Sequence, residues 1–191
     1  MKRLILASSS PSRKSILEQA GVDFEADPSS YDEDMTIDLA PAELAKLLSM
    51  GKAKDVVARH KNAVVLGADS FGVFEGNLLG KPHTLVKARQ MLQMLSGNWH
   101  EFITGFTIID SDSGKTFSDS VTTKLLFKQL TSDEIDRYLA KEDVLELAGA
   151  YSIQTLGAVM VKRIEGSYSN VYGLPIFEVA EALKNFGIDF L

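Results

Sequence analysis

The chain has 191 residues, of which 45% are hydrophobic and 24% charged, so it is long enough to bury a core and resembles ordinary globular proteins in composition. Its formal net charge of −6 argues against a nucleic-acid-binding protein with a broad basic face. Because the chain contains no cysteine, disulfides, thiol nucleophiles and thiolate metal sites are excluded, and a reducing compartment fits.

The first predicted element is a short apolar strand over residues 3–7. Its apolar run, Leu4 to Ala7, is too short for the hydrophobic core of a signal peptide. No stretch of the sequence reaches the roughly 18 apolar residues of a membrane span. We therefore interpret this segment as the first strand of a cytoplasmic protein.

A helix is predicted directly after this strand, over residues 11–20. Ser10 is a good N-cap residue, and Pro11 suits the first helical position. A helix N-terminus carries free N–H groups and a partial positive charge, and Arg13 adds a planar, permanently charged fork. The turn therefore suits a phosphate, although a well-capped surface helix would have the same sequence.

The rest of the chain mixes helices and strands without a strict alternation. Apolar periodicity and turn residues define the elements. In chain order we expect an extended segment near Phe24, a helix over 41–59, a strand over 63–68, a hairpin of 71–74 and 78–79, a helix over 84–95, strands over 99–110 and 116–127, a capped helix over 131–141, strand character over 149–165 and a helix over 176–186. This mixture predicts an α/β fold with a mixed, α+β-type sheet, in a single domain over residues 1–191.

Asp69 is the strongest candidate for chemistry, because it follows the apolar strand 63–68 directly. Ligands of α/β proteins bind where strands end, although an aspartate in this place can also simply form a turn. An ordinary carboxylate, with a pKa near ~3.9, is a weak base at neutral pH unless a divalent cation acidifies the attacking water. A metal-assisted reaction would therefore need a second carboxylate.

Glu33 is the candidate for that second carboxylate, although its acidic loop could equally be a solvated one. The chain offers no thiol and only three scattered histidines, so hard oxygen ligands favour Mg²⁺ or Mn²⁺ over zinc. Lys52 and Lys81 each resemble a surface charge when taken alone. Together with Arg13 and two carboxylates, they would align the phosphates of a phosphoanhydride for cleavage.

Several common catalytic motifs are absent from the sequence. It contains no G-x-x-x-x-G-K-[ST] loop and no G-x-G-x-x-G fingerprint, which disfavours kinase-like and dinucleotide-binding proteins. It also contains no G-x-S-x-G elbow, which disfavours a serine hydrolase.

A set of short blocks, each weak alone, runs in order along nearly the whole chain. The blocks are Leu4–Arg13, Asp32-Glu33, Gly51-Lys52-Ala53, Gly67–Ser70, Leu79–Pro82, Leu95–Gly97, Thr104-Gly105, Ala148–Tyr151, Ile153-Gln154, Gly166–Val171 and Gly173–Pro175. The ordered set resembles the Maf family of nucleoside triphosphate pyrophosphatases, also called septum-formation-inhibitor-like proteins.

The resemblance implies a fold like that of inosine-triphosphate pyrophosphatases, an elongated mixed sheet with two lobes around a central cleft. It implies hydrolysis of a nucleoside triphosphate to the monophosphate and pyrophosphate with a divalent metal, Mg²⁺ or Mn²⁺. Asp69 matches the family's proton acceptor and Glu33 a metal-handling position. The substrate-binding positions are matched by Ser8, Arg13, Lys52 and Lys81. Members are usually cytoplasmic and often dimeric. We therefore expect a nucleoside triphosphate and a second copy of the chain, in a homodimer, as partners, and neither nucleic acid nor a membrane.

Base selectivity in the family depends on three positions, which here are Ser12, Ser70 and Gln154. Members of the dTTP/UTP type typically carry Arg, Thr and Gln there, and members of the 7-methyl-GTP type carry a bulky aromatic residue, Gln and Glu. A hydroxyl at Ser70 and the amide of Gln154 favour dTTP/UTP or a modified pyrimidine nucleotide, with a house-cleaning or regulatory role.

Two alternatives remain open from the sequence. One is an enzyme of the 7-methyl-GTP type. The other is a catalytically weak nucleotide-sensing regulator of cell division, because Leu147 stands where the family commonly has lysine. A plain phosphate-binding module would leave the paired acidic positions unexplained.

Overall fold

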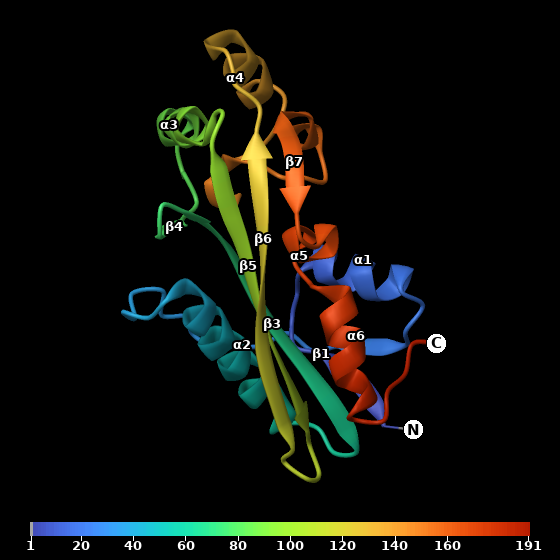
Figure 1. Cartoon of the computed structure of the whole chain (residues 1–191). Coiled ribbons are helices and arrows are strands. Elements are labelled where there is room, and N and C mark those ends of the chain that lie inside the picture. The colour runs from blue at the N-terminus through green and yellow to red at the C-terminus, as the bar shows by residue number, and fades with distance from the viewer. Residues whose placement is uncertain (1) are drawn as a thin grey trace. The chain divides into compact units, whose positions relative to one another are not determined.

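The structure is a computed structural model that describes residues 2–191 (Figure 1). Its strands are β1 (Arg3–Leu6), β2 (Phe24–Ala26), β3 (Ala63–Phe74), β4 (Asn77–Leu79), β5 (Trp99–Asp110), β6 (Thr116–Phe127) and β7 (Val161–Glu165). Its helices are α1 (Pro11–Gln19), α2 (Pro41–Val57), α3 (Leu85–Leu95), α4 (Ser132–Leu139), α5 (Tyr168–Tyr172) and α6 (Ile176–Lys184), with short 3₁₀ helices at Ala148–Ala150 and Leu156–Met160. Within these residues no helix is long and apolar enough to cross a membrane.

The strands form a seven-stranded sheet in the order β2-β1-β3-β5-β6-β7, with β4 paired to β3 beside this path. Strand β1 pairs in parallel with both β2 and β3, whereas the pairs β3–β4 and β6–β7 are antiparallel. The predicted α/β fold with a mixed sheet is therefore confirmed.

The contacts divide the chain into two compact units. Unit 1 contains the chain up to Ser70 together with Ile103–Val121 and Ser169–Leu191, and unit 2 contains Phe71–Phe102 and Thr122–Tyr168. Strands β3, β5 and β6 each contribute residues to both units. The expectation of a single domain with two lobes around a cleft stays a prediction.

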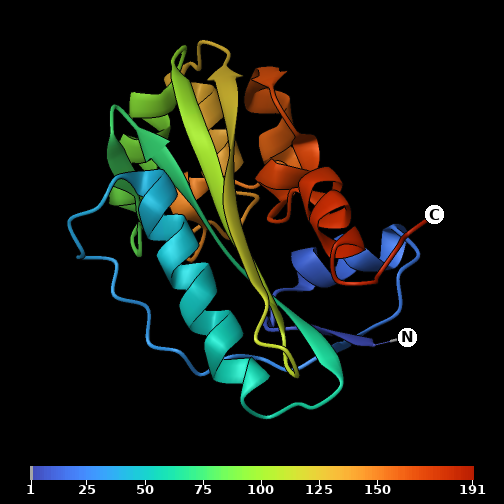
Figure 2. The same cartoon turned by 60° about the horizontal axis from the view of Figure 1, so that its bottom comes forward.

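Unit 1 buries apolar side chains on both faces of its part of the sheet. Figure 2 shows α2 on one face and α1 with α6 on the other. Successive residues of a strand point to opposite faces, so β3 supplies Val64 and Leu66 to one core and Val65 to the other. The first core includes residues of α1 and α6, and the second includes residues of α2. Burial on both faces explains why this part of β3 is a continuous apolar run.

The N-terminal strand and helix form as predicted. Ser10 is the N-cap of α1, and its hydroxyl accepts a hydrogen bond from the Arg13 amide at 3.5 Å. Pro11 is the first residue of the helix. This cap fixes where α1 begins, and with it the direction in which Arg13 leaves the helix.

Strand β3 is longer than the sequence predicts. We expected it to end at Ala68, with Asp69 at its carboxyl end, and this is wrong. The strand continues to Phe74, so Asp69 is an interior residue of β3. A buried carboxylate is expensive inside a sheet unless a partner compensates its charge, and the partner here comes from α2.

Unit 2 has its own apolar core, formed by α3, α4 and the strand residues beneath them. The predicted capping box at Thr131 and Glu134 is present, and the hairpin pairs Phe74 with Asn77. The expected strand over 149–165 is wrong except for β7. Gly149 and Ala150 have φ values of 70° and 62°, which turn the chain and are incompatible with extended backbone.

Candidate active site

A lysine joins the two carboxylates that the sequence singled out. Lys52 Nζ donates to Asp69 Oδ1 at 2.6 Å and lies 2.8 Å from Glu33 Oε1. Asp69 and Lys52 are buried, with 6% and 9% of their surface exposed. One ammonium between two carboxylates leaves one net negative charge in this group of three side chains, which we call the Lys52 cluster.

A glycine explains how Lys52 reaches the strand. A Cβ atom at Gly67 would clash with the α2 backbone at Ser49 and Ala53. Only a glycine therefore permits helix and strand to approach so closely. Lys52 lies between these two contact points, and Asp69 follows Gly67 by two residues on the same face of β3.

Glu33 reaches the Lys52 cluster from a loop, unlike Lys52 on α2 and Asp69 on β3. It belongs to the segment between β2 and α2, and its side chain remains 42% exposed. The three side chains thus come from a helix, a strand and a loop.

Arg13 is the centre of a second group of polar contacts. Its Nε donates to the carbonyl of Gly173 at 3.0 Å, and its two terminal nitrogens donate to Ser8 Oγ at 3.1 Å and Ser70 Oγ at 3.0 Å. The side chain is 9% exposed. Since all three nitrogens are held, the orientation of the guanidinium is fixed.

The charge of Arg13 is only partly compensated. Burial lowers the pKa of Arg13, while the negative charges of Asp69 and Glu33 act through space in the opposite direction. Its three hydrogen bonds all go to uncharged oxygens. A buried guanidinium with neutral partners is well suited to bind a further anion such as a phosphate.

Ser70 contributes to the fixed position of Arg13. Besides accepting from Arg13, its hydroxyl lies 3.0 Å from Thr104 Oγ1 and 3.3 Å from the Gly173 carbonyl oxygen. Sequence reasoning gave no separate role to Thr104, which is fully buried and also lies 3.3 Å from the Asn170 carbonyl. Its signal in the sequence was its place in the block Thr104-Gly105, which gave it no role of its own.

The sequence-predicted residues fall into both units. Unit 1 brings Ser8, Arg13, Glu33, Lys52, Asp69 and Ser70 into the two groups described above. Ser12 is half-buried on α1. Unit 2 contains Lys81, whose Nζ donates to Glu146 at 3.1 Å, and the exposed Gln154. The roles of all these residues in the reaction stay predictions.

The family model described as Maf-like protein matches residues 3–186. The chain belongs to the Maf family. A protein of Syntrophus aciditrophicus named dTTP/UTP pyrophosphatase is 44% identical over 186 residues, which cover 97% of this chain and 91% of the relative. A protein of the same name from Bacillus cereus is 42% identical over 189 residues, covering 99% and 92% of the two chains.

Two solved structures of Ham1 proteins are also similar to this Maf-family chain. The one from Coxiella burnetii has a TM-score of 0.43 at 14% identity and covers 66% of this chain and 73% of its own. The one from Staphylococcus aureus has a TM-score of 0.45 at 17% identity and covers 66% and 72%.

The Lys52 cluster fits the chemistry of a magnesium or manganese site. Among residues 2–191 there is no group of three or more His, Asp or Glu side chains that could enclose a metal. Mg²⁺ rarely needs one, because it usually binds one or two carboxylates and completes its shell with water and substrate phosphates. Two carboxylates close enough to share one ammonium satisfy that requirement.

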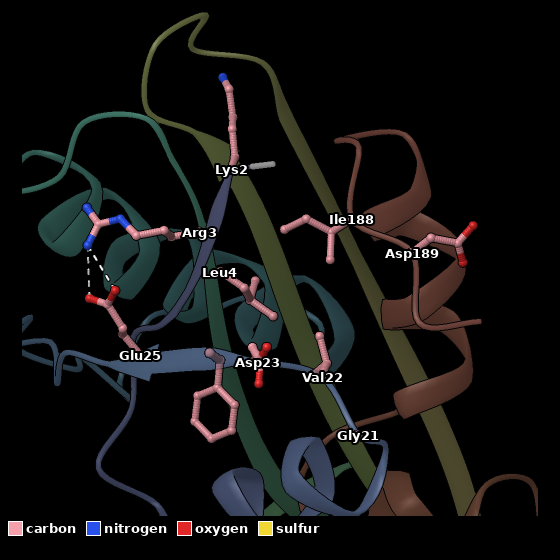
Figure 3. Close-up of a pocket in the computed structure, with 10 residues that line it drawn as sticks. Lys2, Arg3, Leu4, Gly21, Val22, Asp23, Glu25, Ile188 and Asp189 are labelled. Atoms are coloured by element: carbon pink, nitrogen blue, oxygen red, sulfur yellow. Dashed lines mark hydrogen bonds and ion pairs between the residues drawn. The ribbon is translucent and has the colours of Figure 1, made fainter.

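A pocket of about 420 Å³ lies elsewhere in unit 1 (Figure 3). It is lined by residues of β1, β2 and the C-terminal segment, and within it Arg3 is paired with Glu25 at 2.9 Å. None of the Maf-family site residues lines this pocket, and its charges are of both signs. It therefore contributes nothing to the candidate site.

Leu147, which replaces the lysine common in the Maf family, packs against the apolar core of unit 2. The residue before it, Glu146, pairs with Lys81 and also lies 3.2 Å from His83 Nδ1. The leucine thus has a structural role of its own, and its presence does not by itself indicate an inactive protein.

Proposed function

We propose that this Maf-family chain hydrolyses dTTP and UTP, or a modified pyrimidine nucleoside triphosphate, to the monophosphate and pyrophosphate. The observation that carries this proposal is the pair of carboxylates on Lys52, with the buried guanidinium of Arg13 in the same unit. The names of the relatives that are 42% and 44% identical support the choice of substrate.

Asp69 and Glu33 would hold one divalent cation, Mg²⁺ or Mn²⁺. When bound, such a cation neutralises phosphate charge and lowers the pKa of a bound water. Asp69 Oδ1 already accepts a hydrogen bond from Lys52. The other carboxylate oxygen, Asp69 Oδ2, would accept the proton of the attacking water. The water oxygen forms a bond to the α-phosphorus, the bond from that phosphorus to the bridging oxygen breaks, and pyrophosphate leaves with the electron pair.

The cations would bind the phosphate chain. Arg13 presents a fixed guanidinium, with Ser8 beside it as a further hydroxyl. Lys52 has a flexible stem, so its ammonium can pass from the carboxylates to a phosphate when a metal takes the carboxylates. Lys81 is a further candidate for phosphate binding, because it matches one of the family's substrate-binding positions.

The pyrimidine would be recognised by Gln154, with Ser12 and Ser70 as the other selectivity positions. A glutamine amide both donates and accepts hydrogen bonds, which matches the O4 and N3–H edge of thymine and uracil. Ser70 has a second role, because its hydroxyl also supports Arg13.

Replacing Gln154 with alanine should therefore relax base selectivity. We expect the ratio of kcat/KM for dTTP over dCTP to fall about 10-fold, since one lost base contact is worth roughly 1–2 kcal/mol. The turnover number for dTTP should change less than about 3-fold, because the amide contacts no reacting atom. Gln93→Ala, at an exposed position of α3, is the matched control. An unchanged substrate ranking in Gln154→Ala would remove this residue from base recognition.

The proposed function is tested by measuring pyrophosphate release with Mg²⁺ and with Mn²⁺. The substrates are dTTP, UTP, CTP, 7-methyl-GTP, ITP and pseudouridine triphosphate. Metal-dependent release from dTTP and UTP supports the proposal, and preference for 7-methyl-GTP would assign the chain to the other Maf type. Silence from a folded protein that still binds nucleotide would favour the sensing role in cell division. A cytoplasmic location and a homodimer, both implied by the family, are further proposals. Sedimentation velocity tests the dimer.

A further inference from the structure

Glu33 must be brought to Lys52 by something other than its own ion pair. It lies in the segment between β2 and α2, which contains no helix or strand. Its side chain is 42% exposed, and an ion pair this exposed is weak. Ordering a loop backbone has an entropic cost at every residue, so one weak contact cannot hold the segment.

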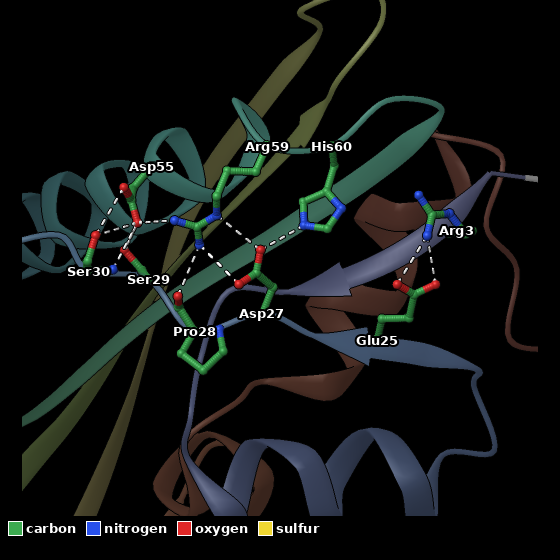
Figure 4. Close-up of polar contacts among 9 residues, drawn as sticks. All are labelled: Arg3, Glu25, Asp27, Pro28, Ser29, Ser30, Asp55, Arg59 and His60. Atoms are coloured by element: carbon green, nitrogen blue, oxygen red, sulfur yellow. Dashed lines mark hydrogen bonds and ion pairs between the residues drawn. The ribbon is translucent and has the colours of Figure 1, made fainter.

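The residues just before Glu33 are attached to the last turns of α2 (Figure 4). Asp55 Oδ2 accepts from the Ser30 amide at 2.8 Å and from Ser29 Oγ at 3.0 Å. Ser29 Oγ in turn accepts from the Tyr31 amide at 3.0 Å. The Ser30 amide, together with the two serine hydroxyls, also lowers the pKa of Asp55, so the carboxylate that receives these bonds is ionised at neutral pH.

A second set of contacts holds the start of the same segment. Arg59 donates to both carboxylate oxygens of Asp27 at 3.1 Å and to the Pro28 carbonyl at 3.0 Å. It also reaches Asp55 at 3.4 Å, and His60 Nε2 lies 2.8 Å from Asp27. Figure 4 shows these side chains as one connected group.

The aromatic ring of Tyr31 adds a third attachment, nearest to Lys52. A Cβ atom at Gly51 would overlap this ring, so Tyr31 covers the bare backbone of α2 at that point. Gly51 and Asp55 are four residues apart and lie on the same face of the helix. Lys52 follows Gly51 directly, so the segment is attached to α2 beside the lysine that Glu33 contacts.

We propose that Asp55, supported by Arg59, is a positioning residue that fixes segment 27–31 on α2 and so holds Glu33 in the Lys52 cluster. The inference rests on the proposed role of Glu33. It assigns no chemistry to Asp55, which acts only through the geometry of Glu33.

The first test compares Asp55→Ala with Glu43→Ala, an exposed acid on the same helix that serves as the matched control. Both variants keep a good helix former in α2 and should fold. In Asp55→Ala we expect amide hydrogen exchange of residues 29–36 to accelerate at least about 10-fold, with α2 itself unchanged. The Kd for Mn²⁺, measured by electron paramagnetic resonance without nucleotide, should rise about 10-fold. Asp55→Asn keeps one oxygen acceptor and should recover most of both properties.

A double-mutant cycle shows whether Asp55 acts through Glu33. Glu33→Gln alone should weaken Mn²⁺ binding and pyrophosphate release, and adding Asp55→Ala should change either by less than about 2-fold. Independent, additive losses in the double variant would overturn the inference, as would normal Mn²⁺ affinity in Asp55→Ala. If no nucleotide is hydrolysed but Mn²⁺ binding still depends on Asp55 through Glu33, the proposed function fails and the positioning role stands.

Discussion

Replacing Asp69 with asparagine is expected to reduce pyrophosphate release at least about 10³-fold, because the variant would lose both the proposed proton acceptor and a proposed metal ligand. The fold should survive. Lys52 keeps Glu33 as a charged partner at 2.8 Å, so its ammonium is not left buried and uncompensated. The loss of one charged hydrogen bond is expected to lower the free energy of unfolding by roughly 1.5–3 kcal/mol.

The measurement needs two readings on the same protein. Turnover is followed by pyrophosphate release with Mg²⁺, and nucleotide affinity by calorimetry, where we expect a Kd for dTTP within about 10-fold of the original because Arg13 remains in place. Asp23→Asn, an exposed acid outside both polar groups, is the control. Turnover at the original rate in a folded Asp69→Asn protein would show that another group accepts the proton.

Acidification is expected to destabilise unit 2 through a single histidine. His100 is buried, packs edge-on against the rings of Phe127 and Tyr151, and has its Nε2 2.8 Å from the Tyr151 hydroxyl. Burial lowers the pKa of His100 from 6.5 to about 4. Between these two values the unfolded chain binds a proton that the folded protein does not. The stability that neutral His100 provides is therefore complete above pH 6.5 and is lost as the pH falls toward 4, by about 3 kcal/mol in all.

This loss is checked by urea unfolding between pH 7 and pH 4.5. His100→Gln stays neutral over this range and keeps a polar partner for Tyr151, so its stability should depend less on pH than that of the original protein. The expected difference in slope is about 1.4 kcal/mol per pH unit, the value for one proton. His83→Gln removes an exposed histidine of the same unit and is the control. Equal slopes in the original protein and in His100→Gln would mean that His100 protonates freely in the folded state.

Much of the fold follows from local sequence signals. The cap at Ser10, the capping box at Thr131 and the long strands β5 and β6 were predicted from cap residues and alternating polarity, and they are present with nearly the predicted bounds. These features depend on neighbours within a few residues, which is why a sequence reveals them.

The errors have two sources, contacts between distant residues and local conformations that leave no periodic pattern in the sequence. The low preference of aspartate for strands predicts that β3 ends at Asp69. The ammonium of Lys52 compensates the charge of this carboxylate, so β3 continues through it. The segment before β7 is rich in small and apolar residues, yet the positive φ of Gly149 and Ala150 bends it into turns. The short helix α5 was not predicted, because five residues give too little periodicity.

The candidate site was also only partly predictable from the sequence. The residue types of Asp69, Arg13 and Lys52 could be selected from the sequence, since charged groups beside glycines and apolar strands stand out. That Lys52 would bind both carboxylates, and that Ser70 and Thr104 would support Arg13, depends on three-dimensional contacts. No spacing along the chain encodes them.

The two polar groups of the site meet β3 at consecutive residues. Asp69 accepts a hydrogen bond from Lys52 of α2, and Ser70 accepts one from Arg13 of α1. One peptide unit, with its Cα atoms about 3.8 Å apart, therefore sets the spacing between the proposed base, Asp69, and Ser70, which holds the guanidinium of Arg13. Loop motion cannot change that spacing. Inserting or deleting one residue in β3 before this pair would turn each side chain to the wrong helix, so the length of this strand should be far less tolerant of change than its apolar composition.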